Sequence, residues 1–125
     1  MRSAPDYLAT RLAINVLGGD FASRINMNLR EDKGYSYGGG AFIRYFPSAA
    51  VFRAFSSVRS DVTKESLVEL VREIEGLAAR GITEAELELA KTSDILSLPA
   101  RFANATSTLA SFRELTYYDL PLDWW

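Results

Sequence analysis

Two neighbouring stretches of this 125-residue sequence are typical of β-strands, and helical patterns flank them on both sides. Aromatic and β-branched residues predict a strand over 35–46, and side-chain alternation predicts a partner strand over 51–59. Pro47 between them favours a tight turn, so the two strands are expected to form an antiparallel hairpin. A two-stranded sheet is not stable alone, so helices must cover it or further strands must extend it. We therefore expect an α+β fold in which this hairpin belongs to a larger antiparallel sheet packed with helices.

Two helices are predicted before the hairpin. Apolar residues at helical spacing predict a first helix over 6–17, with Gly18 as a left-handed stop. Asp20 is then expected to cap a second helix that runs from Phe21 to about Glu31. The apolar face of this second helix is expected to contain Phe21, Ile25 and Leu29, which recur four residues apart.

Three further helices are predicted after the hairpin. Thr63 is expected to cap the first of them, and Gly81 to end it. Thr83 and Glu86 have the spacing of a capping box for the next helix, which Pro99 interrupts. A last helical pattern includes Phe102, Leu109 and Phe112, and residues 117–125 are expected to form an extended tail. The buried stripe of the helix after Thr63 is expected to consist of Leu67, Leu70, Val71, Ile74, Leu77 and Ala78.

The composition excludes several classes of chemistry. The chain has no histidine and no cysteine, so a catalytic triad with histidine, a disulfide and a thiolate metal site cannot form within it. Lys and Arg number 14 against 16 Asp and Glu, a balance that does not favour general nucleic-acid binding. No apolar run approaches the length of about 20 residues that a membrane helix needs. Neither a nucleic-acid nor a membrane partner is therefore expected.

The stretch LREDKGYSYGGG at 29–40 concentrates glycines, tyrosines and charges between the second helix and the first strand. Its glycines do not fit a phosphate-binding loop, because they follow a helix and no Lys-Ser/Thr pair comes after them. Lys33, Gly34, Tyr35 and Tyr37 partly match the aromatic signature of an RRM, which leaves an RNA-binding module as one alternative. The glycines at 38–40 either allow close approach of a peptide or only permit twist of the strand.

A longer motif resembles a known family. Residues 15–38, NVLGGDFASRINMNLREDKGYSYG, are similar to the core of the M16 metallopeptidases, which include insulinase, pitrilysin and the mitochondrial processing peptidase. GITEAELELAK at 81–91 resembles a later helix of the family. LPARF at 98–102 and YYDLP at 117–121 resemble its bacterial members. The positions that match the core motif are Leu17, Gly18, Gly19, Ser23, Arg24, Leu29, Arg30, Glu31, Gly34 and Tyr37.

The resemblance implies that residues 1–125 are part of a C-terminal, non-catalytic M16 domain with the LuxS/MPP-like metallohydrolase fold, incomplete at both ends. In this family one domain or subunit carries a His-x-x-Glu-His zinc motif and the other helps to hold the peptide. Because this chain has no histidine, we expect no cofactor in it and no cleavage by it alone. Zinc is expected in the partner domain of a zinc-dependent metallopeptidase.

The resemblance also implies roles for single residues. Arg30 and Tyr37 match the arginine and tyrosine with which the non-catalytic domain contacts the bound peptide, and both offer hydrogen-bond donors suited to a carbonyl. Their positions alone favour structural roles, since an arginine near a helix C-terminus suits the helix dipole and Tyr37 can face a core. The other motif residues are expected to be structural, namely Gly18, Gly19, Ser23, Arg24, Glu31 and Gly34.

The expected partners are a His-x-x-Glu-His-bearing M16 domain or subunit and a peptide substrate. A second copy of the chain could cover an exposed sheet edge. A purely structural or assembly role of the same fold is the main alternative function. No targeting segment is evident, and the compartment stays open between the cytoplasm and the periplasm of a bacterium.

Overall fold

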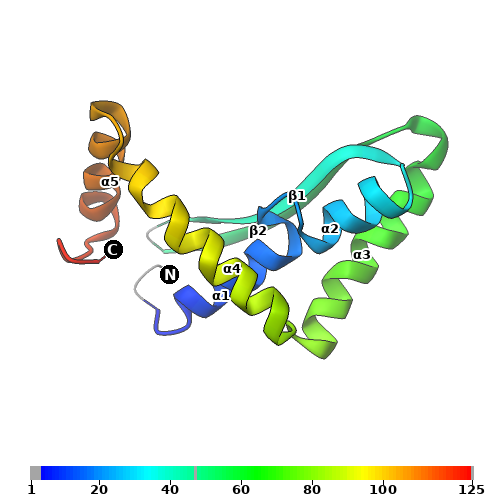
Figure 1. The fold of residues 1–125 in the computed structure, drawn as a ribbon, viewed down its shortest axis with the longest axis horizontal. Coiled ribbons are helices and arrows are strands. Elements are labelled where there is room, and N and C mark those ends of the chain that lie inside the picture. The colour runs from blue at the N-terminus through cyan, green and yellow to red at the C-terminus, as the bar shows by residue number, and fades with distance from the viewer. Residues whose placement is uncertain (1–3, 47, 125) are drawn as a thin grey trace.

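A computed structural model describes residues 4–46 and 48–124 of the chain (Figure 1). The order of elements is helix, helix, strand, strand, helix, helix, helix, which confirms the predicted α+β class with its antiparallel hairpin. Pro47, the residue expected in the hairpin turn, and Trp125 in the expected tail lie outside the described residues. The helices are α1 (Tyr7–Ile14), α2 (Arg24–Asn26), α3 (Thr63–Arg80), α4 (Glu84–Ser97) and α5 (Ala105–Tyr118), and the strands are β1 (Ser36–Tyr45) and β2 (Ala50–Val58).

Short helical turns of other types extend several of these helices. A π-helical turn, Asn15–Gly19, continues α1, and another, Met27–Asp32, continues α2. A 3-10 turn, Ser60–Val62, precedes α3, and a second one, Leu98–Phe102, joins α4 to α5. The second 3-10 turn begins where Pro99 removes a backbone donor, as the sequence predicts.

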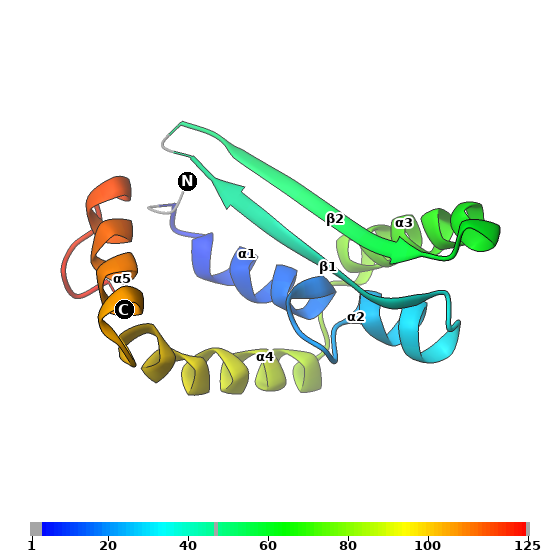
Figure 2. The same cartoon turned by 90° about the horizontal axis from the view of Figure 1, so that it is seen from above.

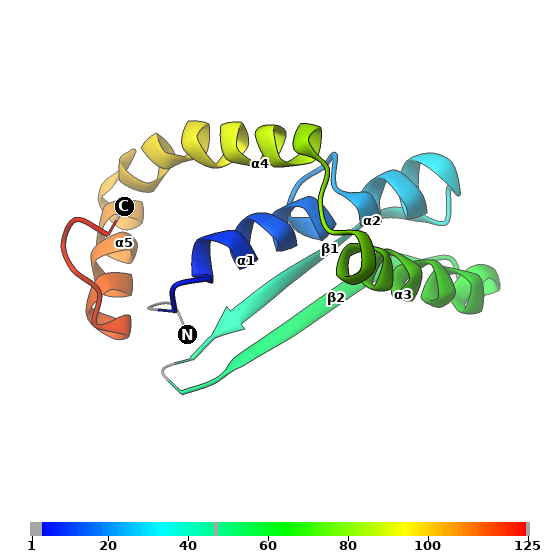
Figure 3. The same ribbon diagram turned by 90° about the horizontal axis from the view of Figure 1, so that it is seen from below.

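The core lies between one face of the hairpin and the helices that precede it. Figures 2 and 3 show α1, α2 and α4 on the same side of the hairpin. Ile25 and Leu29 are almost fully buried against Leu17 and Ala41, so the predicted apolar face of the second helix is confirmed at these two positions. Around this centre pack the partly buried residues Ile14, Tyr35, Ala54, Leu70, Ile74 and Leu77.

The start of the second helix differs from the prediction. Asp20 does not cap it, because its side chain accepts a hydrogen bond from the adjacent Phe21 N–H and the helix begins three residues later, at Arg24. Ser23 occupies the extended position before the helix. Phe21 therefore lies ahead of the helix and is exposed rather than part of the apolar face. Spacing alone could not reveal this, since the chain reverses between residues 20 and 23.

Gly18 is not a left-handed stop. It lies within the π-helical turn, and the chain leaves the helix at Asp20, which adopts an extended conformation. Its role is close approach: a Cβ on Gly18 would lie 2.2 Å from the backbone nitrogen of Ala41 and 2.7 Å from the carbonyl carbon of Gly40. A Cβ on Gly40 would in turn lie 2.9 Å from the Gly18 carbonyl oxygen. The glycines of β1 thus let the π-helical turn contact the strand directly.

The helix α3 also differs in detail. Thr63 is its first residue rather than its cap, because the preceding 3-10 turn moves the cap position to Val62 and the Thr63 hydroxyl donates to the Ser60 carbonyl. Leu70, Ile74 and Leu77 pack against the core as predicted. The remaining predicted members of the stripe are exposed, namely Leu67, Val71 and Ala78. The buried face is therefore narrower than the apolar pattern, and Gly81 ends the helix with φ of 69°.

The capping box of α4 is confirmed. The Thr83 hydroxyl accepts from the Glu86 N–H at 3.3 Å, and the Glu86 carboxylate accepts from the Thr83 N–H at 2.7 Å. A second capping box, between Asn104 and Ser107, starts α5 and was not predicted. This helix runs through Tyr118, and turns follow at residue 119 and at residues 122–123, so the expectation of an extended tail is wrong for the described residues. Among the described residues, no helix combines the length and apolar character of a membrane span.

Candidate functional site

The site forms where the second helix turns into β1. Gly34 adopts a left-handed conformation with φ of 61°, which costs little for a glycine. Its N–H donates to the Arg30 carbonyl at 3.2 Å, and the Tyr35 N–H donates to the Leu29 carbonyl at 2.8 Å. These two bonds close the end of the helix and send the chain back as a strand, so Arg30 and Tyr37 stand on opposite sides of one turn.

A β-bulge then sets the direction of Tyr37. Ser36 pairs with Val58 and Gly39 with Ser56, so the register shifts between these pairs. The Ser36 hydroxyl donates to the Ser57 carbonyl at 2.8 Å and accepts from the Gly38 N–H at 2.9 Å, which holds the irregular backbone. Tyr37 lies at the centre of the bulge and is 100% exposed. Bulges commonly re-aim a side chain next to a functional site.

Asn26 fastens the bulge to the helix. Its side-chain amide donates to the Asp20 carbonyl at 3.0 Å and to the Ser23 hydroxyl at 3.3 Å. Its Oδ1 accepts from the Gly39 N–H at 2.8 Å, so one buried side chain joins the loop, α2 and β1. Sequence reasoning missed this residue. The sequence signal that could have indicated it is a polar residue next to Ile25, which belongs to the predicted apolar face of the helix.

Arg30 is held by two neighbours. Its guanidinium carbon lies 4.0 Å above the centre of the Phe21 ring, within the range of a cation–π contact. Its Nε lies 3.5 Å from Glu31 Oε1. Arg30 remains 32% exposed, so its other N–H groups can reach a ligand. Phe21 was expected in the core, and the structure instead places it as the support of this guanidinium.

Arg30 and Tyr37 line the same open pocket, which has a volume of about 670 Å³. Within the described part of the chain, no residue hydrogen-bonds the Tyr37 hydroxyl, so this donor faces solvent. Sequence reasoning missed Arg59, whose guanidinium pairs with Asp61 at 3.2 Å beside the pocket. The full lining is Arg30, Glu31, Gly34, Tyr35, Ser36, Tyr37, Ser57, Val58 and Arg59.

The motif residue Arg24 points away from this pocket and joins helices. Its Nε donates to Glu86 Oε1 at 2.6 Å, one terminal nitrogen donates to Glu86 Oε2 at 2.7 Å, and the same nitrogen donates to the Gly81 carbonyl at 2.9 Å. Hydrogen bonding from Arg24 is the main cause that lowers the pKa of Glu86 to about 2. Gly19 lies against Asn15, and Ser23 is buried at the start of α2. These contacts are structural.

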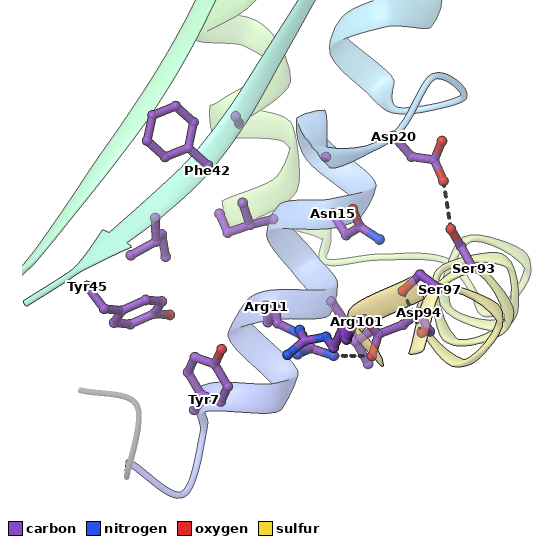
Figure 4. A pocket seen from close by; sticks show the side chains of 15 residues that line it. Tyr7, Arg11, Asn15, Asp20, Phe42, Tyr45, Ser93, Asp94, Ser97 and Arg101 are labelled. Atoms are coloured by element: carbon purple, nitrogen blue, oxygen red, sulfur yellow. Dashed lines mark hydrogen bonds and ion pairs between the residues drawn. The ribbon is translucent and has the colours of Figure 1, made fainter. Parts of the chain in front are cut away.

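A second pocket, of about 530 Å³, lies between α1, β1 and α4 (Figure 4). The Arg11 guanidinium pairs with the Asp94 carboxylate across it, and the Ser93 hydroxyl donates to Asp20 Oδ2 at 2.9 Å. Figure 4 shows both contacts joining α4 to the α1 region. Arg11 is neutralised by Asp94, and Asp20 accepts from Ser93. These contacts join the helices around the pocket and are structural.

The described residues do not provide a zinc site. They contain no group of three or more His, Cys, Asp or Glu side chains that could hold a metal ion. The sequence has neither of the two residue types, histidine and cysteine, that dominate zinc coordination. The geometry at Arg30 and Tyr37 instead supplies hydrogen-bond donors, which suit carbonyl and carboxylate oxygens.

Comparison with protein families agrees with the motif. The family model for the peptidase M16 inactive domain matches residues 1–93. The chain belongs to the peptidase M16 inactive-domain family. The matched range includes the motif at residues 15–38. A search of curated proteins found no match.

Solved structures share the fold of this M16 inactive domain. A peptidase M16 inactive domain from Pseudomonas fluorescens superposes with a TM-score of 0.85 at 25% identity, over 98% of this chain and 29% of that chain. A conserved protein from Enterococcus faecalis gives 0.76 at 20% identity, over 90% of this chain and 26% of that chain. A provisionally assigned zinc protease from Bordetella pertussis gives 0.66 at 21% identity, over 98% and 65%. The chain therefore spans between about a quarter and two thirds of these structures.

The fold rules out one alternative function. An RRM presents its aromatic residues on a four-stranded sheet. Here the described residues form a two-stranded sheet, and Tyr35 packs against the core instead of standing as a stacking platform. The RNA-binding interpretation of KGYSYG is therefore wrong.

Proposed function

We propose that this M16 inactive domain contributes part of a peptide-binding chamber to a zinc peptidase whose metal site lies on a partner domain or subunit. The family membership and the name of the Bordetella pertussis structure support this role. The donor set of this chain does not fit zinc, so the metal and its His-x-x-Glu-His ligands belong to the partner. This chain then supplies contacts that bind and orient the peptide.

Arg30 and Tyr37 are the residues that make these contacts. The Arg30 guanidinium offers several N–H donors in a fixed plane, and the Tyr37 phenol offers one O–H donor. Phe21 and Glu31 hold Arg30 in place before a substrate binds, so this donor can orient a peptide carbonyl at a reduced entropic cost. They also stabilise the negative charge that a carbonyl oxygen gains when it is attacked.

The observation that carries the proposal is the position of both side chains on one open pocket. The bulge leaves Tyr37 fully exposed although it lies within a strand beside a packed core. A fully exposed tyrosine hydroxyl without an intramolecular partner contributes little to the stability of the fold. The Tyr37 hydroxyl is free to donate to an oxygen of a bound peptide. Arg30 lines the same pocket and can donate to the same peptide.

The test reconstitutes the chain with its catalytic half and measures the cleavage of a fluorogenic peptide. Tyr37→Phe removes only the hydroxyl, and Arg30→Lys keeps the charge but removes the planar donors. We expect each change to lower kcat/KM by about a hundredfold, the lower end of the loss that follows removal of one transition-state donor. Tyr117→Phe and Arg72→Lys are the matched controls on exposed helix surfaces and should leave turnover unchanged.

The alternative is a purely structural or assembly role. In that case Arg30→Lys and Tyr37→Phe would leave both turnover and the formation of the complex intact. Unchanged kcat/KM in both variants would therefore reject the substrate role and favour the structural one. The homo-oligomer expected through an exposed sheet edge stays a prediction, and sedimentation of the isolated chain would test it.

A further inference from the structure

The hairpin has a second face, which the helices do not cover. Residues directly opposite each other in an antiparallel pair share a face, and Phe42 opposes Arg53 while Arg44 opposes Val51. All four side chains are exposed, in contrast to Ala41 and its partner Ala54 on the core face. We name this surface the Phe–Arg face, and it consists of Phe42, Arg44, Val51, Arg53 and Phe55.

Its aromatic and cationic groups are arranged together. The rings of Phe42 and Phe55 meet edge to face with centres 6.1 Å apart, and the Phe55 ring lies over the backbone of Gly40. The guanidinium carbon of Arg53 lies 5.9 Å from the centre of the Phe55 ring. Phe42 is 42% exposed and Phe55 is 46% exposed, so the face presents an apolar surface to any chain laid across it.

Neither arginine of this face has an acidic partner. Within residues 4–46 and 48–124, Arg44 and Arg53 form no ion pair, whereas Arg24, Arg59 and Arg72 each pair with a carboxylate. Two unpaired guanidinium groups beside exposed rings are complementary to a partner that carries both carboxylate and apolar side chains.

The spacing suits an extended peptide. Arg53 lies opposite Phe42, and Arg44 lies two residues after Phe42 on the same strand. Arg44 and Arg53 are therefore diagonal neighbours across the hairpin. Diagonal neighbours on one face of a sheet lie about 7–8 Å apart. Side chains two residues apart in an extended peptide lie about 7 Å apart. Two acidic residues separated by one residue therefore match the two arginines.

The Phe–Arg face also leads to the candidate site. Alternate residues of β2 point to the same side, so the face continues from Arg53 and Phe55 to Ser57, and the extended residue Arg59 follows the strand one position after its end. Ser57 and Arg59 line the pocket that contains Arg30 and Tyr37. A peptide lying along β2 would thus reach the pocket about four residues beyond its contact with Arg53, a distance of roughly 13 Å.

We propose that the Phe–Arg face is a specificity subsite for peptide segments in which two acidic side chains, separated by one residue, stand among apolar ones. This inference rests on the proposed function, because it takes the partner to be the peptide held at the Arg30–Tyr37 pocket. The apolar residues of the peptide pack on Phe42 and Phe55, and its carboxylates pair with Arg44 and Arg53.

The test measures binding of two labelled peptides to the purified protein by fluorescence anisotropy. One peptide carries two aspartates separated by one residue among valines, and the other has asparagine in both places. We expect the aspartate peptide to bind roughly fivefold more tightly at low ionic strength, the combined effect of two exposed ion pairs, and the preference to shrink with salt. The double variant Arg44→Gln, Arg53→Gln should bind both peptides equally.

The matched control is the double variant Arg72→Gln, Lys91→Gln, which removes the same charge from the exposed surfaces of α3 and α4 and should keep the preference. Thermal melts of both double variants show whether the fold is intact. Equal binding of the two peptides, no binding of either, or an equal loss in the control would overturn the proposal. The preference is measured with Arg44 and Arg53 changed, whereas the turnover test changes Arg30 and Tyr37, so the two proposals can fail separately.

Discussion

Arg24 on α2 and Glu86 on α4 form a paired contact in which both carboxylate oxygens accept from the same guanidinium, at 2.6 Å and 2.7 Å. Glu86 Oε2 also accepts from the Thr83 N–H at 2.7 Å, so the carboxylate that receives Arg24 is the one that completes the capping box. The Glu86 carboxylate therefore both caps the start of α4 and joins α4 to the helix that leads to Arg30.

Replacement of Arg24 by alanine should destabilise the fold by about 2 kcal/mol, because it removes charge-assisted hydrogen bonds and leaves Glu86 half-buried without its cation. The measurement is the free energy of unfolding in urea. Lys91→Ala is the control, since it removes only an exposed pair with Glu88 and should change the stability much less. Equal effects of the two changes would contradict the contribution assigned to Arg24.

The same pair predicts a dependence of stability on pH. The pKa of Glu86 is about 2 in the folded chain against an ordinary 4.5, so the folded state favours the ionised carboxylate. Its contribution is fully present above pH 4.5 and is lost as the pH falls from 4.5 toward about 2. Urea titrations across this window should show a steeper loss of stability for the natural chain than for Glu86→Gln. Parallel curves would show that Glu86 has an ordinary pKa.

Gly18→Ala should be strongly destabilising. The new methyl would lie 2.2 Å from the Ala41 nitrogen and 2.8 Å from the Ala41 Cβ, so helix and strand must separate. We expect a loss of about 3 kcal/mol, at the upper end of overpacking effects, seen as a lower melting temperature. Gly38→Ala is the control, because its nearest neighbour to the added Cβ is the Asn26 Oδ1 at 3.6 Å. A mild effect at Gly18 would contradict the observed close approach.

Asn26→Ala should loosen the bulge that presents Tyr37. The substitution removes the acceptor of the Gly39 N–H and the donor to the Asp20 carbonyl, and the loss of these two partly buried hydrogen bonds should cost about 1 kcal/mol. Hydrogen exchange at Gly39 should speed up by more than exchange in α5. Ser93→Ala removes an exposed hydrogen bond to Asp20 and serves as the control. Unchanged exchange at Gly39 would show that Asn26 does not hold the bulge.

Phe21→Ala should act on Arg30 rather than on the fold. Phe21 is 63% exposed, and its cation–π contact contributes no more than about 1 kcal/mol. On the proposed function, the freed guanidinium should raise KM severalfold while kcat changes less, because Phe21 positions Arg30 and does not touch the peptide. Met27→Ala, an exposed change on the π-helical turn that carries Arg30, should leave both constants unchanged. A matching effect in Met27→Ala would assign the change to the helix as a whole.

The parts of the fold that depend on local signals could be predicted. The hairpin followed from one segment rich in aromatic and β-branched residues and one alternating segment. The start of α4 followed from Thr83 and Glu86, which are three residues apart and form a local capping box. The predictions that were wrong concerned contacts between segments. Gly18 was taken for a helix stop because its partner Ala41 is distant in sequence, and Phe21 was assigned to the core although the chain reverses before Arg24.

At the candidate site, too, local sequence signals could be predicted and contacts between distant segments could not. The motif around Arg30 and Tyr37 indicated the family, which the family comparison confirms, and made these two residues candidates, since the motif is contiguous and needs no knowledge of packing. Only the tertiary structure decided that a bulge turns Tyr37 fully to solvent and that Phe21 supports Arg30. It also decided that Arg44 and Arg53 share an uncovered face. The physical reason is that exposure and pairing depend on which distant segments the chain brings together, whereas helix caps, strand alternation and family motifs are written within a few consecutive residues.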